Sequence, residues 1–184
     1  MIGIIAGAIK LIGFIPYIIS IVRGRTKPSK ASWFVWMVLT WIFAVSYWQS
    51  GARNTLWVPI AAMFATTLVA LLSIKYGERG WTSFDKKCLV AATFGLLLWW
   101  IFDNPLLAVL TSLTVDIIGA LPTMRKVWKN PGSEDKISWT IFIASSVVNV
   151  FAIEQWVFAV AVYPVIMLIS DSIIFVPLWL KKHE

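Results

Sequence analysis

The sequence has few of the residues that disulfides and metal sites require. It contains one cysteine, Cys88, which excludes an internal disulfide and a cysteine-based metal site, and one histidine, His183, near its C-terminal end. Charged residues make up 14% of the chain, whereas ordinary soluble domains have about 25%. The chain also has no HExxH, GxSxG or P-loop motif. We therefore expect neither an enzyme nor a cofactor or metal site.

Apolar residues are abundant instead. Hydrophobic residues make up 59% of the 184 residues. Apolar runs of about 20 residues recur along the chain, and a helix of that length crosses a bilayer core of about 30 Å. The 12 Trp residues fit the same environment, because Trp is enriched at membrane interfaces. We therefore predict an all-α membrane protein with the lipid bilayer as a partner.

Apolar runs and turn residues divide the chain into seven predicted transmembrane helices. Gly and Pro residues mark most of the joints between them. The N-terminal run has no basic region before it and is too long for a signal peptide, so it is interpreted as the first helix. The seven predicted helices cover residues 2–22, 32–48, 56–76, 84–102, 105–127, 137–153 and 156–180.

Lysine and arginine alternate between the connections of these helices. The connections after the first, third and fifth helices have four Lys or Arg residues each in or beside them, and residues 181–184 contain two more. The other connections contain Arg53 alone or none. Because positively charged loops stay in the cytoplasm, we predict the N-terminus outside and the C-terminus in the cytoplasm of a multi-pass protein of the bacterial inner membrane. The net charge of +7 then reflects topology and predicts no nucleic-acid partner.

A segment of the first half returns 106 residues later in the chain. Residues 12–36, IGFIPYIISIVRGRTKPSKASWFVW, align without a gap with residues 118–142, IGALPTMRKVWKNPGSEDKISWTIF. Composition bias is the alternative explanation, but the matched residues are mostly not aliphatic, so the alignment favours an internal repeat. Besides the first Ile, the identical pairs are Gly13 and Gly119, Pro16 and Pro122, Lys30 and Lys136, Ser32 and Ser138, and Trp33 and Trp139.

The duplication predicts two three-helix repeats and a linker helix. Residues 1–80 are the first repeat, residues 81–104 the linker helix and residues 105–184 the second repeat. An odd number of helices inverts the direction in which the next copy enters the membrane, and the linker helix restores it. We therefore expect two parallel repeats around a pseudo-twofold axis along the membrane normal, with a solute site between them near the midplane.

The 3+1+3 plan, the outside N-terminus and a proline late in the first helix of each repeat resemble the SWEET, SemiSWEET and PQ-loop superfamily. The resemblance covers nearly the whole chain in topology but only short motifs in sequence. That superfamily has a Pro-Gln pair at these places, whereas this chain has Tyr17 after Pro16 and Thr123 after Pro122. It also lacks the proline that SWEET transporters have in the second helix of each repeat. The resemblance therefore implies the fold better than it implies sugar specificity.

On this resemblance we expect a transporter that moves a small polar solute, a sugar or a similar metabolite, by alternating access. Other interpretations stay open. Vitamin carriers of the nicotinamide riboside type share the 3+1+3 plan but are longer and oppositely oriented. A receptor of the KDEL-receptor kind would bind its ligand in the same cavity without transporting it, and a membrane scaffold would have no cavity. The sequence leaves open the solute, proton coupling and a homo-oligomer.

Three ionisable residues, Lys10, Asp116 and Asp171, lie near the middle of predicted helices. A charge at the bilayer centre costs about 2.5–3.5 kcal/mol on insertion scales, so such residues usually pair or line a wet cavity. Lys10 and Asp116 are separated by the repeat offset, which predicts that they face one another across the central axis. Their ion pair is either a structural lock between the repeats or a gate or proton-coupling pair that breaks on opening.

Asp171 is the strongest candidate for a solute-binding residue. The sequence gives it no evident charged partner, and it lies deep in the last helix, where SWEET-like proteins place a solute-binding asparagine. The alternative is a neutral acid that hydrogen-bonds to Ser or Thr neighbours. Asn149, Trp36 and Tyr163 are further candidates for the solute site, although each also suits contacts between helices.

Pro16 and Pro122 are the predicted hinges. Proline removes a helix hydrogen bond and clashes with the carbonyl four residues earlier, so it kinks a helix. Kinks at the same place in both repeats predict that the repeats rock together; the alternative is that the kinks only help the helices to pack. Gly13 and Gly119 lie just before these prolines and permit close approach of helices.

Overall fold

The computed structural model shows an all-helical protein and describes residues 1–49, 57–78, 80–101 and 105–180. Arg53, Arg79 and residues 181–184, which entered the charge count above, lie outside the described residues. Within those ranges the elements in chain order are α1 (Ile2–Val22), α2 (Lys30–Gln49), α3 (Trp57–Tyr76), α4 (Ser83–Ile101), α5 (Pro105–Lys129), the 3-10 helix η1 (Pro131–Ser133), α6 (Lys136–Phe151) and α7 (Phe158–Leu180).

The all-helical fold and the seven helices are confirmed among the described residues, with ends that differ by a few positions from the prediction. α5 continues to Lys129 because the chain turns only at Pro131, where η1 begins. α6 begins after Asp135, whose carboxylate accepts a hydrogen bond from the backbone N–H of Ser138 at 2.8 Å. This hydrogen bond satisfies one of the free N–H groups at the helix start and fixes where α6 begins.

Three helices in the described part of the chain are long and apolar enough to cross a membrane. They are α1, α3 and the segment Ala161–Leu180 of α7. Their outer faces expose large apolar side chains, for example Ile15 on α1 at 58% and Phe64 on α3 at 63%. Soluble monomers rarely expose large contiguous apolar patches. These helices fit a protein that associates with a membrane, and the predicted count of seven spans stays a prediction.

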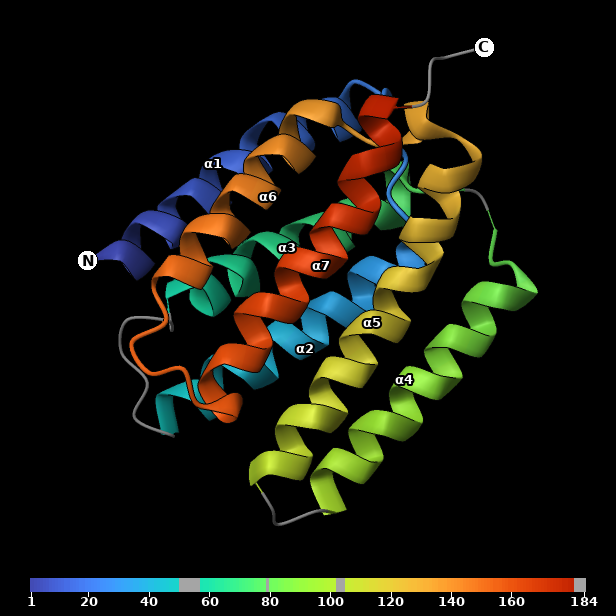
Figure 1. The fold of residues 1–184 in the computed structure, drawn as a ribbon. Helices are drawn as coiled ribbons and strands as arrows, with labels where there is room; N and C mark the ends of the chain where they lie inside the picture. Colours follow the sequence, from blue (N-terminus) through green and yellow to red (C-terminus); the bar gives the residue numbers. More distant parts are fainter. Residues whose placement is uncertain (50–56, 79, 102–104, 181–184) are drawn as a thin grey trace.

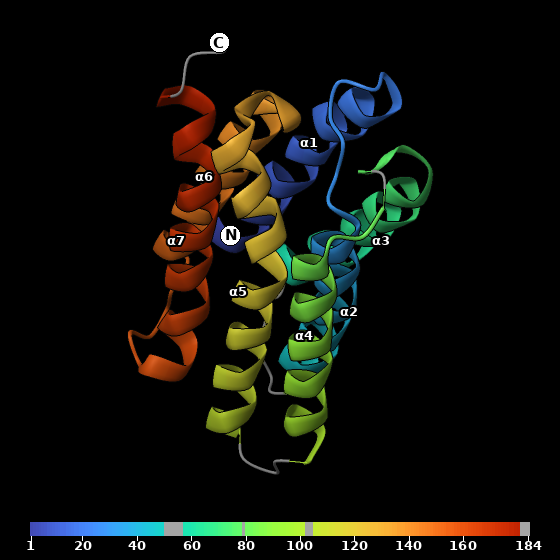
Figure 2. The same ribbon diagram turned by 90° about the vertical axis from the view of Figure 1, so that its right-hand side faces the viewer.

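The helices form two groups that meet along a seam, with α4 at the side (Figures 1 and 2). In the first group, α1–α3, the helix α3 contacts both α1 and α2. In the second group, α5–α7, the helix α7 contacts both α5 and α6. Across the seam, α1 lies against α6 and α2 lies against α5, while α4 packs mainly along α5. The seam therefore brings residues from both ends of the sequence together.

Two glycines allow the close contacts across this seam. A Cβ atom added at Gly13 of α1 would lie 2.8 Å from two ring carbons of Phe142 and 3.1 Å from Ile141 Cγ2 on α6. One added at Gly119 of α5 would lie 2.9 Å from Val35 Cβ on α2. Both distances are shorter than ordinary van der Waals contact, so the two helix pairs approach as closely as they do because these residues have no side chain.

Gly119→Ala is expected to lower the free energy of unfolding by about 1–3 kcal/mol, because the added methyl group overpacks the contact between α5 and α2. Val35 is β-branched and buried, so it has little freedom to move aside. Unfolding of the detergent-solubilised protein measures the loss. The double variant with Val35→Ala should recover most of it, and an unchanged stability in Gly119→Ala would contradict the packing described here.

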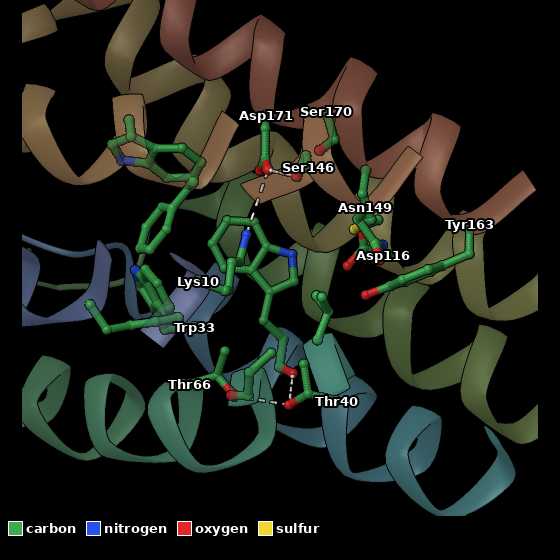
Figure 3. Close-up of a pocket in the computed structure, with 17 residues that line it drawn as sticks. Lys10, Trp33, Thr40, Thr66, Asp116, Ser146, Asn149, Tyr163, Ser170 and Asp171 are labelled. Atoms are coloured by element: carbon green, nitrogen blue, oxygen red, sulfur yellow. Dashed lines mark hydrogen bonds and ion pairs between the residues drawn. The ribbon is translucent and has the colours of Figure 1, made fainter. Parts of the chain in front are cut away.

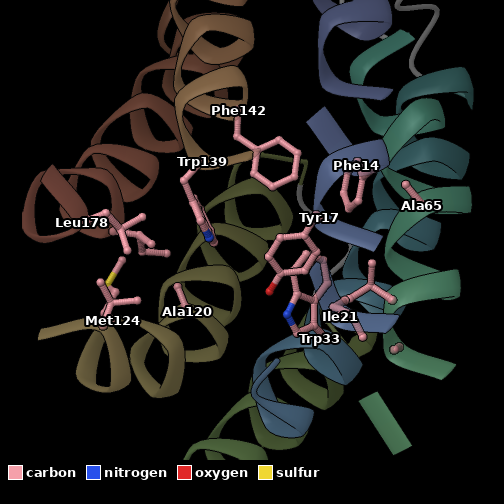
Figure 4. Packing of buried hydrophobic residues seen from close by; sticks show 14 residues of the cluster. Phe14, Tyr17, Ile21, Trp33, Ala65, Ala120, Met124, Trp139, Phe142 and Leu178 are labelled. Carbon is pink, nitrogen blue, oxygen red and sulfur yellow. The ribbon is translucent and has the colours of Figure 1, made fainter. Parts of the chain in front are cut away.

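The main buried cluster lies along the same seam and is rich in aromatic rings (Figure 4). Phe14 of α1 lies 4.8 Å from Phe142 of α6, measured between ring centroids, and Tyr17 of α1 lies 5.1 Å from Trp33 of α2. Trp139 contacts Phe142 in a T-shaped arrangement at 5.4 Å. Aromatic pairs at such distances add to the free energy gained from burial, so this cluster ties the two groups together.

Candidate functional site

A cavity of about 80 Å³ lies on the seam beside the aromatic cluster (Figure 3). Every α-helix except α4 contributes described residues to its lining. A water molecule needs about 10–15 Å³ of such space, so the cavity has room for a few waters or a very small solute. Larger ligands occupy pockets of about 300–1,000 Å³. In this conformation the site therefore holds only a small molecule.

The structure brings six of the predicted site residues together around this cavity. They come from five helices, and Trp36, Tyr163 and Asn149 lie on the same lining as the charged residues. The six are Lys10, Trp36, Asp116, Asn149, Tyr163 and Asp171. Their shared location follows from the seam, because α1 and α2 face α6 and α5 there. A role for any of them in solute binding stays a prediction.

Lys10 pairs with Asp171, and this differs from the predicted pair of Lys10 with Asp116. Lys10 Nζ lies 3.5 Å from Asp171 Oδ2 and 4.6 Å from the centroid of the Phe142 ring. The same carboxylate oxygen accepts a hydrogen bond from Ser146 Oγ at 2.6 Å. Because α1 packs against α6, the long Lys10 side chain reaches the α6–α7 side of the cavity. Asp171 therefore has the charged partner that the sequence did not reveal.

A second polar pair lies on the opposite side of the cavity. Thr40 Oγ1 on α2 and Thr66 Oγ1 on α3 are 2.8 Å apart and share a hydrogen bond. Both residues line the cavity, as does Ser146. Sequence reasoning missed all three, although Thr40 and Ser146 are separated by the repeat offset of 106 residues. This spacing between two hydroxyl side chains in apolar helices could have indicated from the sequence that both line the cavity.

Two buried acceptors in the lining have no protein partner among the described residues. Asn149 is 2% exposed, and its Oδ1 atom has no hydrogen bond. Asp116 is 7% exposed, and no hydrogen bond or ion pair joins its carboxylate to another described residue. A buried polar group without a partner costs about 1–3 kcal/mol, so such groups in native proteins usually face water or a ligand. Both residues are therefore suited to contact a solute.

Aromatic side chains close one end of the cavity. Phe14, Trp33, Trp139 and Phe142 line it at the end where α1 and α5 finish and α2 and α6 begin. Trp33 and Trp139 are each 2% exposed, so solvent does not reach them from the loops. Trp36 packs on both, with ring centroids 5.1 and 6.4 Å away. These buried rings therefore form the wall of the cavity at this end.

Behind the rings lies a buried polar group, the Glu134 cluster, formed by Tyr17, Lys126, Glu134 and Trp139. Glu134 Oε2 accepts hydrogen bonds from Tyr17 Oη at 2.6 Å and from Trp139 Nε1 at 3.2 Å. Glu134 Oε1 forms an ion pair with Lys126, which also donates to the backbone carbonyl of Lys27. Glu134 is only 4% exposed. One carboxylate therefore joins α1, α5, α6 and the α1–α2 connection.

The predicted hinges lie beside this cluster rather than in the cavity lining. Pro16 precedes Tyr17 in α1, and Pro122 lies inside α5. Thr123, the next residue, donates its backbone N–H to Ser32 Oγ of α2 at 3.2 Å, which adds a contact between the two groups. A bend at either proline would move residues that hold the aromatic end of the cavity closed. The hinge role itself stays a prediction.

The comparisons with known proteins add no relative for this site. No family model, curated protein or solved structure matches the chain. The function is therefore inferred from the chemistry of the cavity and from the packing of the helices around it.

Proposed function

We propose that the chain is a multi-pass membrane transporter of SWEET-like architecture that moves a small polar solute by alternating access. The observation that carries the proposal is the cavity with charged and polar side chains in its lining, on the seam between two helix groups with apolar outer faces. Charged groups deep in a membrane are expensive and are usually retained for function. A purely structural bundle would gain nothing from leaving the Asp116 and Asn149 acceptors without partners.

The packing of the helices supports a duplicated 3+1+3 plan. If each helix of α1–α3 is matched with its counterpart in α5–α7, the contact of α1 with α6 corresponds to the contact of α5 with α2. In the same way, the contacts of α3 with α1 and α2 correspond to those of α7 with α5 and α6. The residues at the two close approaches agree, because Gly13 meets Ile141 and Gly119 meets Val35, with the 106-residue offset in both pairs. α4 has no counterpart in this exchange, which suits a linker helix. Such repeats commonly enclose the solute site of a transporter.

The same plan supports seven spans with the N-terminus outside in a bacterial inner membrane. The Lys- and Arg-rich connections then face the cytoplasm. In this orientation the Glu134 cluster and the aromatic rings lie at the cytoplasmic end of the cavity. The conformation described above is therefore closed toward the cytoplasm, and release of the solute on that side requires the cluster to break.

The opening step is expected to separate Tyr17 from Glu134. Tyr17 belongs to the first group, whereas Lys126, Glu134 and Trp139 belong to the second group or to its connection. Rocking of the two groups at Pro16 and Pro122 would stretch the bond between Tyr17 Oη and Glu134 Oε2, because this bond crosses the seam, as the bonds from Lys126 to Lys27 and from Thr123 to Ser32 do. Interfaces of this kind switch between two packed arrangements rather than deforming continuously.

Counterflow in proteoliposomes tests the proposal. Purified protein is screened by thermal shift against sugars, amino acids, amines and vitamins, and vesicles loaded with a stabilising compound are then given a trace of the same compound in labelled form. A transporter accumulates the label transiently above its outside concentration, and ionophore-treated vesicles show whether protons are involved. Binding without any counterflow would instead identify a receptor, and it would contradict transport.

Asp171→Asn provides the matched test of the site in the same assay. It keeps the size of the side chain but removes the charge that pairs with Lys10, so counterflow is expected to fall at least about tenfold. Asp85→Asn, at the start of α4 and away from the cavity, is the control and should leave counterflow unchanged. A scaffold without a solute site predicts that Asp171→Asn alters stability only and never ligand binding.

A further inference from the structure

The described lining of the cavity contains two acidic side chains and one basic side chain. Its charged side chains are Lys10, Asp116 and Asp171. Lys10 is already engaged by the Asp171 carboxylate at 3.5 Å and by the Phe142 ring. Ser146 donates to the same Asp171 oxygen, so that carboxylate is satisfied by a cation and a hydroxyl group. Asp116 forms no ion pair with a described residue, although Lys10 lies close enough to act on its carboxyl group electrostatically.

The lining contains two side chains whose oxygens can accept hydrogen bonds from a solute. Asn149 Oδ1 is buried without a hydrogen-bond partner, and Asp116 adds a carboxyl group that makes no hydrogen bond to a described residue. Trp33 Nε1 is the one buried donor of the described lining without a partner. The Thr40 and Thr66 hydroxyl groups already bond to one another. A molecule that fits the cavity must therefore donate hydrogen bonds to carboxylate and amide oxygens. It finds few hydrogen-bond donors in the lining.

The walls of the cavity also favour a cation. Tyr163 lies near Asp116 and Asn149 in the lining (Figure 3). Trp36 contributes a second aromatic side chain to the lining. Aromatic faces attract cations most strongly where water is excluded. The structure already contains such a contact, because Lys10 Nζ lies 4.6 Å from the centroid of the Phe142 ring. Lys10 is the one basic side chain in the described lining.

We propose that the solute is a small organic ammonium compound, which the cavity selects over neutral and anionic molecules of the same size. The ammonium group binds between the Asp116 carboxylate and Asn149 Oδ1, and the aromatic side chains of Trp36 and Tyr163 cover it. The ion pair of Lys10 and Asp171 stays intact beside the bound ammonium group. Its two charges offset one another, so the pair does not expel the solute. This inference rests on the proposed transport function and names the chemical class of its substrate.

A series of three probes of nearly equal size tests the charge selectivity on the unmodified protein. Ethanolamine, ethylene glycol and glycolate share a hydroxyl-bearing two-carbon skeleton and carry a positive, neutral and negative charge at neutral pH. Each is titrated against the purified full chain while the unfolding temperature is followed, at constant ionic strength with sodium chloride as the balancing salt. Ethanolamine is expected to raise the unfolding temperature at concentrations where the other two have no effect. Equal responses to ethanolamine and ethylene glycol, or no response to ethanolamine, would overturn the inference.

Asp116→Asn locates the selectivity in the cavity. The substitution keeps the shape of the side chain and removes the unpaired charge, so it should weaken ethanolamine binding at least about tenfold while raising the stability of the free protein. Glu78→Gln is the matched control, because it removes an acidic group that lies between α3 and α4 and does not line the cavity. If both variants bind ethanolamine as the unmodified protein does, the assignment of Asp116 is wrong.

Counterflow of labelled ethanolamine separates a failure of this inference from a failure of transport. Selective binding of ethanolamine through Asp116 without counterflow would support the ammonium site and refute transport. Counterflow of ethylene glycol or another neutral solute, unaffected by excess ethanolamine, would support transport and refute the ammonium site. Because the charge series uses the unmodified protein, its result holds even if Asp116→Asn does not fold.

Discussion

Replacing Glu134 by alanine is expected to lower the free energy of unfolding by about 3–5 kcal/mol, the usual loss when one partner of a buried ion pair is removed. Lys126 is 8% exposed and would keep its charge in a buried place without a carboxylate. Tyr17 Oη and Trp139 Nε1 would lose their acceptor at the same time. The effect is large because a single side chain satisfies three buried donors.

The neighbouring acid provides the control for this prediction. Asp135 caps α6 through the Ser138 N–H and faces the solvent side of the connection more than Glu134 does. Asp135→Ala should therefore lower the stability by only about 1 kcal/mol, as cap removal usually does. Glu134→Gln keeps an acceptor for Tyr17, so its loss of stability should lie between those of Glu134→Ala and Asp135→Ala. Equal losses in Glu134→Ala and Asp135→Ala, measured by unfolding in detergent, would contradict the role assigned to the Glu134 cluster.

Lys10→Met is expected to destabilise the protein by about 3–5 kcal/mol and to suppress counterflow. The substitution leaves Asp171 without its cation in a cavity that already contains the unpaired Asp116. Both members of the Lys10–Asp171 pair are largely buried, with side-chain exposures of 17% and 11%, so water compensates little. Two carboxylates that share one cavity without a cation repel one another, which adds to the loss.

A pair of double-mutant cycles shows which acid Lys10 pairs with. Combining Lys10→Met with Asp171→Asn should recover much of the lost stability, with a coupling energy of about 1–3 kcal/mol. The same cycle with Asp116→Asn should give a smaller coupling, because no ion pair joins Lys10 to Asp116 in the structure. A larger coupling to Asp116 than to Asp171 would restore the pairing predicted from the repeat and contradict the structure.

The sequence predicted the helices and six of the 17 described lining residues for physical reasons that act locally. Apolar runs interrupted by Gly and Pro define helices wherever a chain crosses an apolar phase. Lys10, Asp116, Asp171 and Asn149 were recognised because polar groups in such runs must face one another or a cavity. That argument requires no knowledge of which helices are neighbours, so it identified the residues correctly as a group in one place.

Which acid pairs with Lys10 depends on which helices pack against α1, and the sequence alone did not show this. The 106-residue offset relates Lys10 to Asp116, but equivalence in a repeat does not fix the direction of a long side chain. The contact of α1 with α6 turns Lys10 toward Asp171 instead. Glu134 was missed for a related reason. It lies between a Pro-Gly turn and Lys136, where an acidic residue usually faces solvent, and only the tertiary fold places Tyr17 and Lys126 around it.

Access to the cavity from the two sides of the membrane tests the central claim most directly. Ser170 lines the cavity and is 6% exposed, so a cysteine there reports whether reagents reach the site. The experiment uses Ser170→Cys with Cys88→Ser, in sealed vesicles of known orientation, and a membrane-impermeant thiol reagent added on one side at a time. Alternating access predicts modification from either side, faster from the cytoplasmic side when Glu134 is replaced by alanine. Modification from one side only, or from neither side, would contradict the account.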